Sequence, residues 1–184
     1  MHLVAALFLA HLVGDFPLQT DWIYKLKTER WTGIALHSLI HVLATVPLIT
    51  APLANWPLLV TLGVTHFVVD FVKVRLPNRY QTFSFVADQL VHVLVILAVA
   101  SIWSASTTAI LPLNITIPLI IYGIFLGTLV FLWVLAIELS QNGWGEQQLV
   151  AWARQNLLRL SQYAGIPLLL LLCVQWYRVT EHPS

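Results

Sequence analysis

Histidine and aspartate residues stand four positions apart in several apolar stretches of this 184-residue sequence. The four pairs are His11 and Asp15, His37 and His41, His66 and Asp70, and Asp88 and His92. On an α-helix, residues i and i+4 share a face with Cβ atoms about 5–6 Å apart, so each pair can direct two side chains at one point. Imidazole nitrogens and carboxylate oxygens suit Zn²⁺, Mn²⁺ or Fe²⁺. The eight side chains therefore predict one or two sites for a divalent metal ion.

The overall composition indicates that these pairs lie in lipid. Hydrophobic residues make up 59% of the chain and charged residues only 9%, whereas soluble domains carry roughly 25% charged residues. The net charge of +1 does not indicate the basic surface that binds a nucleic acid. The single cysteine, Cys173, excludes an internal disulfide and a thiolate cluster, so a metal would be held by nitrogen and oxygen.

The apolar segments are long enough to cross a bilayer, which takes about 20 mostly apolar helical residues. Membrane helices are predicted at residues 2–18, 33–51, 57–76, 83–103 and 112–138, with a shorter sixth at 164–178. The fold class is therefore an all-α membrane protein with about six transmembrane helices. Because the connections are short, the first four helices should form an up-and-down bundle. This divides the chain into a four-helix bundle with the His/Asp cluster (1–103) and a C-terminal helical hairpin (104–184).

Residues 146–162 differ from the other segments in being amphipathic. Leu149, Trp152 and Leu157 recur near helical spacing, while Arg154 and Arg159 lie largely elsewhere. This pattern predicts a helix that lies along the cytoplasmic membrane interface. A helix that binds a partner protein is the alternative.

The basic residues predict the orientation of the chain. Eight lie in three connections, namely Lys25, Lys27, Arg30, Lys73, Arg75, Arg79, Arg154 and Arg159, and one, Arg178, lies on the other side. The positive-inside rule places these three connections in the cytoplasm and both termini outside. The first segment has no basic region before it and is expected to be a retained helix rather than a signal peptide.

The four pairs are also expected to lie at one depth. Those in the first and third segments come near the C-terminal ends, whereas those in the second and fourth come near the N-terminal starts. Antiparallel helices bring all four to the cytoplasmic third of the membrane. An Asp at a helix centre costs about 2.5–3.5 kcal/mol on insertion scales, which favours a functional site. The alternative is a polar network that only holds the bundle together.

Further polar residues surround the pairs. Gln19 and Gln89 are expected to orient the ligands by hydrogen bonds. Lys73 follows Asp70 by three residues and could hold a phosphate or carboxylate of a substrate. The alternative, with equal weight, is that the Lys73 side chain extends to the membrane edge and places its charge in water. Asp88 is the preferred general base, if it does not bind metal.

Several of these motifs together resemble a family of bacterial integral-membrane proteins of unknown function, DUF3307. The resemblance rests on the run from His11 to Trp22, on Lys25, His37 and His41, on His66-Phe-Val-Val-Asp70 with Lys73, and on Asp88-Gln89-Leu-Val-His92. It covers roughly residues 1–100 and implies a location in the bacterial inner membrane, with no established activity.

A weaker likeness is to the membrane-bound metal-dependent hydrolases. It rests on His37-Ser38 and on Gly63-Val-Thr-His66-Phe-Val-Val-Asp70. This likeness implies hydrolysis of a membrane-associated or phosphorylated substrate.

The leading functional hypothesis is a membrane-embedded metal-dependent hydrolase of an ester or phosphoester, with its site open to the cytoplasmic leaflet. Its expected partners are membrane lipids and a lipid-like or phosphorylated substrate, with no nucleic acid. One alternative is an ion- or proton-coupled transporter, because intramembrane Asp and His chains also relay protons. The other is a noncatalytic scaffold or accessory subunit.

Overall fold

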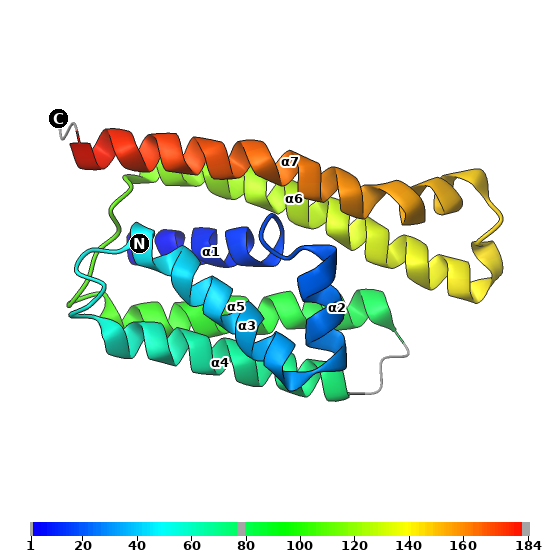
Figure 1. Ribbon diagram of the computed structural model, residues 1–184, viewed down its shortest axis with the longest axis horizontal. Helices are drawn as coiled ribbons and strands as arrows, with labels where there is room; N and C mark the ends of the chain where they lie inside the picture. Colours follow the sequence, from blue (N-terminus) through cyan, green and yellow to red (C-terminus); the bar gives the residue numbers. More distant parts are fainter. Residues whose placement is uncertain (1, 77–79, 182–184) are drawn as a thin grey trace.

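The structure, a computed structural model, describes residues 2–76 and 80–181 (Figure 1). Its helices are α1 (His2–Asp15), α2 (Asp21–Glu29), α3 (Trp31–Thr45), α4 (Trp56–Arg75), α5 (Gln81–Trp103), α6 (Leu113–Leu139) and α7 (Gln148–Glu181). A 3₁₀ turn follows α3 and a single π-type turn, Ser140–Trp144, follows α6. These residues contain one isolated β-bridge, between Ile49 and Ala109, and no strand. The predicted all-α class is confirmed.

Five segments, rather than six, are long and apolar enough to cross a membrane. They are Trp31–Leu48, Trp56–Arg75, Gln81–Trp103, Leu113–Trp144 and Gln148–Glu181. The first predicted span is the one that falls short, because α1 has 14 residues and rises only about 21 Å, against a hydrocarbon core of about 30 Å. It ends at Asp15, just before Phe16 and Pro17, and proline cannot donate the next helical hydrogen bond.

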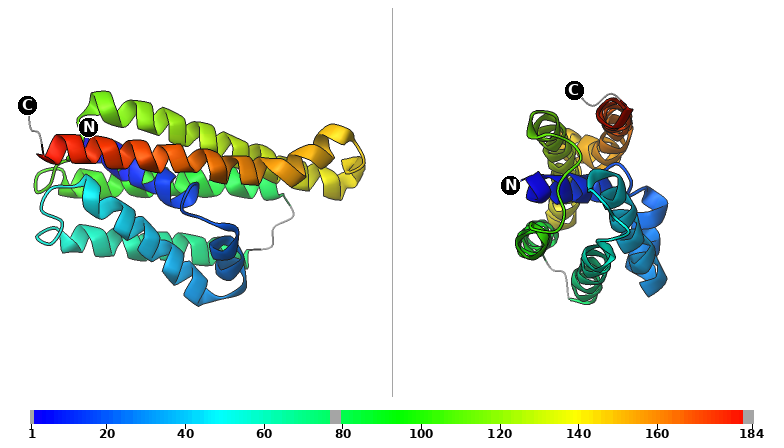
Figure 2. Two further views of the ribbon diagram at one scale, coloured as in Figure 1. Left: turned by 45° about the horizontal axis from the view of Figure 1, so that its top comes forward. Right: turned by 90° about the vertical axis from the view of Figure 1, so that its left-hand side faces the viewer.

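Helix α1 lies in the middle of the bundle. Figure 2 shows it surrounded by the longer helices, and it packs against α3, α5 and α6. Ten of its 14 residues are buried. Leu9 and Leu12 of α1 share one apolar core with Leu126 of α6 and Leu168 of α7. The His/Asp helices and the C-terminal hairpin therefore pack on a common central helix.

The C-terminal hairpin corrects the prediction for residues 146–178. The structure has one continuous helix, α7, instead of a separate interfacial helix and a short sixth span. Helix α7 runs beside α6 and is tied to it by hydrogen bonds from Ser161 Oγ to the Leu126 carbonyl (3.2 Å) and from Tyr122 Oη to the Ala164 carbonyl (2.8 Å). Pro167 lies inside α7, because a membrane helix packed on a neighbour tolerates the one backbone bond that proline removes.

Helix α2 was not predicted, and it crosses one end of the bundle between α1 and α3 (Figure 1). Thr20 caps its first turn, with Oγ1 accepting a hydrogen bond from the Ile23 amide at 3.4 Å. Its buried residues are Ile23 and Lys27, which stand four apart and so share a face. Lys27 is therefore a buried helical residue and not an exposed loop charge. It does not count among the basic residues that predict the orientation of the chain.

The other basic residues of the three connections lie at the end of the bundle crossed by α2, which we call the α2 end, apart from Arg79, which lies outside the described residues. The α6–α7 hairpin extends past the other helices there (Figure 1). Which side of a membrane the α2 end faces stays a prediction.

Candidate metal centre

Four helices bring together all eight side chains that the sequence singles out as metal ligands. Asp15 and His11 come from α1, the histidine pair from α3, and the remaining two pairs from α4 and α5. The eight are His11, Asp15, His37, His41, His66, Asp70, Asp88 and His92, and none of them is more than 7% exposed. We call this set the His/Asp cluster. Their i, i+4 spacing places both members of each pair on the inward face of its helix.

The tightest part of the cluster is a triad of Asp15, His37 and His41. Asp15 Oδ1 lies 3.1 Å from Nε2 of His37 and 3.1 Å from Nε2 of His41, and the two nitrogens are 3.3 Å apart. Ligands about 2.0–2.1 Å from a tetrahedral Zn²⁺ stand about 3.3 Å from one another. A ring nitrogen of His66 also lies within 4.8 Å of these ligand atoms. The triad thus has the spacing of three ligands around one ion.

A second possible ligand group consists of Asp70, Asp88 and His92, whose ligand atoms also lie within 4.8 Å of one another. His92 Nε2 is 3.8 Å from Asp70 Oδ1 and 3.6 Å from Asp88 Oδ1. His66 connects this group to the triad, because its ring stacks on those of His41 (3.7 Å between centroids) and His92 (4.3 Å). The cluster therefore offers two adjoining positions for a cation.

Several ligand atoms in the cluster have no hydrogen-bond partner. Among the buried side-chain atoms of residues 2–76 and 80–181, these include Nε2 of His66, Nε2 of His92 and Oδ1 of Asp88. Leaving a buried polar atom unpaired costs about 1–3 kcal/mol. The ligand atoms of His66 and His92 lie within 4.8 Å of one another. A cation bound between them would remove this cost at both nitrogens, so the donor set fits a divalent metal.

Lys27 is the member of this site that sequence reasoning missed. Its Nζ donates a hydrogen bond to Asp70 Oδ2 at 3.0 Å, and the side chain is buried. Burial alone would lower the pKa of Lys27, but the negative charges of Asp70, Asp15 and Asp88 outweigh burial and raise that pKa. Lys27 is therefore a charged ammonium. The signal that could have found it is its place four residues after Ile23, on the apolar face of a short helix.

The two lysines near the cluster bind corresponding oxygens of two carboxylates. Lys27 holds Oδ2 of Asp70, and Lys73 donates to Oδ2 of Asp88 at 2.5 Å. In each carboxylate, Oδ1 is the oxygen that lies nearer to His92. Lys73 is therefore paired inside the protein, rather than extended as a free cation at the membrane edge.

The two glutamines contact Asp15 in different ways. Gln89 Nε2 donates to Asp15 Oδ2 at 2.8 Å, and its Oε1 accepts from His11 Nε2 at 3.2 Å. Gln89 thereby orients the carboxylate of the triad and occupies one nitrogen of His11. Gln19 Nε2 donates instead to the Asp15 backbone carbonyl at 3.3 Å, so it contacts the end of α1 and not the carboxylate.

Gly14 allows the imidazole of His41 to lie directly against the backbone of α1. A Cβ at this position would overlap three atoms of that ring. We expect Gly14→Ala to push His41 away from Asp15 and to lower metal affinity at least about tenfold, although no ligand is removed. Metal analysis of the purified variant measures the effect.

The matched control is Gly63→Ala in α4. There a Cβ would stand 2.9 Å from a terminal methyl of Val42, which can rotate away. Equal metal content in both glycine variants would show that His41 need not lie against α1.

Comparison with known proteins identifies the family of this chain. The chain matches the family model described as protein of unknown function (DUF3307) over residues 3–120. The match extends past the predicted limit of about residue 100 and contains the whole His/Asp cluster. No curated protein and no solved structure matches the chain. Because the matched residues make up more than half of the 184, the chain belongs to the DUF3307 family.

Proposed function

We propose that this protein binds one or two divalent metal ions in the His/Asp cluster and uses them to hydrolyse an ester or phosphoester at the membrane. The observation that carries the proposal is the triad, whose three ligand atoms are separated by 3.1, 3.1 and 3.3 Å. Two histidines and one carboxylate that leave coordination positions open are a ligand set of catalytic zinc sites.

The buried charges also support a cation. Among the residues that the structure describes, three buried carboxylates, those of Asp15, Asp70 and Asp88, lie beside two ammonium groups, those of Lys27 and Lys73. When the imidazoles are neutral, as metal ligation requires, these buried groups carry one net negative charge. A divalent ion compensates this charge and also coordinates the unpaired nitrogens of His66 and His92. A purely structural network would leave those nitrogens unpaired.

Cavities around the cluster favour access from one side. At the α2 end, a cavity of about 250 Å³ reaches Asp15, Lys27 and Asp88. On the far side, the cavity lined by His11, His66 and their neighbours holds only about 30 Å³, room for one or two water molecules. This asymmetry supports a site that takes its substrate and water from one face, rather than a transport path.

The chain's own residues can carry the steps of hydrolysis. A bound divalent ion would supply Lewis acidity toward water and the ester. Asp88 Oδ1, which is unpaired, accepts the proton of the attacking water. The water oxygen bonds to the ester carbon or phosphorus, the bond to the leaving oxygen breaks, and Asp88 returns the proton to that oxygen. The products are an acid and an alcohol.

The basic residues at the α2 end support one orientation of the site. We propose that this end faces the cytoplasm of a bacterial inner membrane, with both termini on the outer side. Water and soluble products would then exchange with the cytoplasm through the cavity at the α2 end.

The test uses the full-length protein, purified in detergent without chelators and then loaded with Zn²⁺ or Mn²⁺. We expect one or two ions per chain by elemental analysis, and release of product from a panel of lipid esters and phosphoesters. Asp88→Asn should retain the ion of the triad and lower the rate at least about 100-fold. Glu146→Gln, which changes an exposed carboxylate far along the chain, should keep the full rate.

Three results would overturn parts of this proposal. Absence of stoichiometric metal from the loaded protein would leave a structural network in its place. Metal without turnover of any member of the panel would reduce the protein to a metal-binding scaffold. Ion flux in proteoliposomes that depends on Asp70, without hydrolysis, would establish a transporter.

A further inference from the structure

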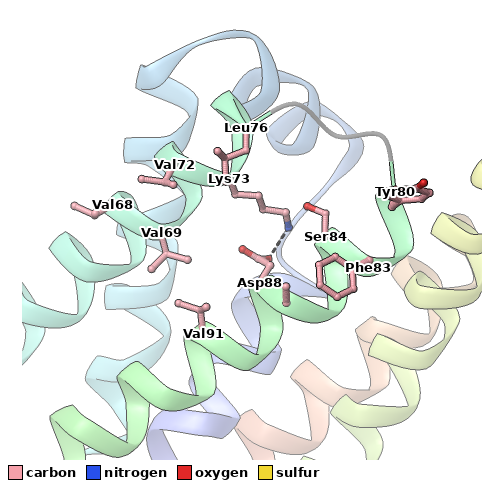
Figure 3. Close-up of a pocket in the computed structure, with 11 residues that line it drawn as sticks. Val68, Val69, Val72, Lys73, Leu76, Tyr80, Phe83, Ser84, Asp88 and Val91 are labelled. Atoms are coloured by element: carbon pink, nitrogen blue, oxygen red, sulfur yellow. Dashed lines mark hydrogen bonds and ion pairs between the residues drawn. The ribbon is translucent and has the colours of Figure 1, made fainter.

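Two cavities of different character meet at Lys73 and Asp88. One, which we call the α4–α5 groove, has a volume of about 480 Å³ and is lined mainly by apolar side chains (Figure 3). The other is the cavity at the α2 end, which reaches the His/Asp cluster. The residues that line both are Lys73, Leu76, Ser84 and Asp88. A molecule that occupied both cavities would pass between these side chains.

The α4–α5 groove opens sideways, between two helices long enough to span a membrane. Val68 and Val72 of α4 are 50% and 49% exposed, and Phe83 of α5 is 74% exposed. In a bilayer these side chains face hydrocarbon. The groove is therefore a place where a lipid chain can lie against the protein without leaving the membrane.

The inner end of the groove is the place where its lining becomes polar. Figure 3 shows Lys73 reaching across from α4 to the Asp88 carboxylate on α5, with Ser84 beside them. The Lys73 side chain is 27% exposed, and an ammonium has three hydrogens, of which Asp88 takes one. The remaining donors are available to an anion that enters from the groove.

The cavity beyond this point suits a head group rather than a chain. Its lining includes Lys27, Gln81 and Gln89. Gln19 also contributes a buried Oε1 that has no hydrogen-bond partner. The His/Asp cluster directly adjoins this cavity, because Asp88 lines the cavity and its Oδ1 lies 3.6 Å from Nε2 of His92. Apolar on one side and polar on the other, the two cavities match an amphiphile.

We propose that the α4–α5 groove binds a membrane lipid with a phosphate-bearing head group, whose hydrocarbon chain lies along Val68 and Val72 and whose phosphate is held by Lys73. Binding of the lipid follows from the groove itself. Its role as the substrate rests on the proposed function, because only a metal in the adjacent cluster would make the head group reactive. The lipid enters from the bilayer, while water reaches the same point from the cavity at the α2 end.

The experiment measures retention of dioleoylphosphatidic acid by the full-length protein in neutral detergent, using native mass spectrometry. We expect one lipid per chain, no retention of dioleoylglycerol, which lacks the phosphate, and no displacement by millimolar inorganic phosphate. Val72→Trp fills the groove and should lower retention at least about tenfold. Lys73→Gln should lower it by a similar factor, because a hydrogen bond to a charged group is lost.

Val60→Trp is the matched control, since Val60 lies on the same helix with 51% exposure but outside the groove. It should retain the lipid fully. Val68→Trp repeats the test if Val72→Trp unfolds at a lower temperature than the control. Equal retention by the Val60 and Val72 variants would overturn the groove as the site. Full displacement by inorganic phosphate, or equal retention of dioleoylglycerol, would overturn the specific claim for a phosphate-bearing lipid.

Metal analysis of the same samples separates the two proposals. Val72→Trp should lose the lipid and keep its metal. If the unmodified protein retains the lipid in the groove but holds no metal, the hydrolase fails and the lipid site stands. If it holds metal but no lipid, the groove proposal fails and the metal site stands.

Discussion

An Asp15→Asn variant is expected to lose at least about 100-fold in metal affinity. Asp15 Oδ1 is the atom shared by both histidines of α3, and Oδ2 accepts the hydrogen bond from Gln89. Asparagine keeps the shape of the side chain but removes its charge and one acceptor oxygen. The variant therefore tests the ligand role with little change in packing. Titration of the metal-free protein with Zn²⁺, followed by calorimetry, measures the affinity.

His2→Ala serves as the control for this measurement, because His2 is an exposed histidine at the start of the same helix. It removes one imidazole from the chain without touching the cluster, and its affinity should equal that of the unmodified protein. If Asp15→Asn also bound metal with unchanged affinity, the ion would have to lie elsewhere, and the triad would be a hydrogen-bonded structure only.

Lys27→Met is expected to lower the free energy of unfolding by about 3–5 kcal/mol, because it leaves Asp70 buried with an uncompensated charge. Asp70 is 1% exposed, and within residues 2–76 and 80–181 the hydrogen bond that its carboxylate accepts comes from Lys27. Removing both charges, in Lys27→Met with Asp70→Asn, should recover most of the loss. Unfolding in mixed micelles with increasing dodecyl sulfate, followed by circular dichroism, gives the three free energies.

Lys25→Met is the matched substitution on α2, where Lys25 is exposed. It is expected to change the free energy of unfolding by no more than about 0.5 kcal/mol, the range of ordinary surface substitutions. A loss for Lys25→Met as large as that for Lys27→Met would show that α2 is sensitive to charge in general. The pairing of Lys27 with Asp70 would then not explain the stability of the site.

The membership of the cluster could be predicted because it depends on local geometry. A spacing of four residues places His66 and Asp70 on one helical face wherever that helix lies. The reversal of direction between neighbouring membrane helices then brings such faces to one depth. The structure places these residues together, as it does the other three pairs. Their role as metal ligands is tested by the Asp15→Asn and Gly14→Ala variants.

Other features depend on contacts between segments far apart in the chain. Lys27 lies beside Asp70 because α2 folds across the end of the bundle, a separation of 43 residues. Helix α7 stays continuous through Pro167 because α6 packs along it. The spacing of Lys27 from Ile23 shows that the two share a face of α2. It does not show which residue of another helix that face contacts.

The sequence by itself determined that this is a helical protein suited to a membrane, that it belongs with the DUF3307 proteins, and which eight side chains gather. Hydrophobicity and helical period are properties of single segments, so they can be read one segment at a time. Only the tertiary structure decided that the short α1 is the central helix, that Lys27 joins the cluster, and that the α4–α5 groove leads to it. Those outcomes depend on how the segments pack against one another, and packing is settled by all of them together.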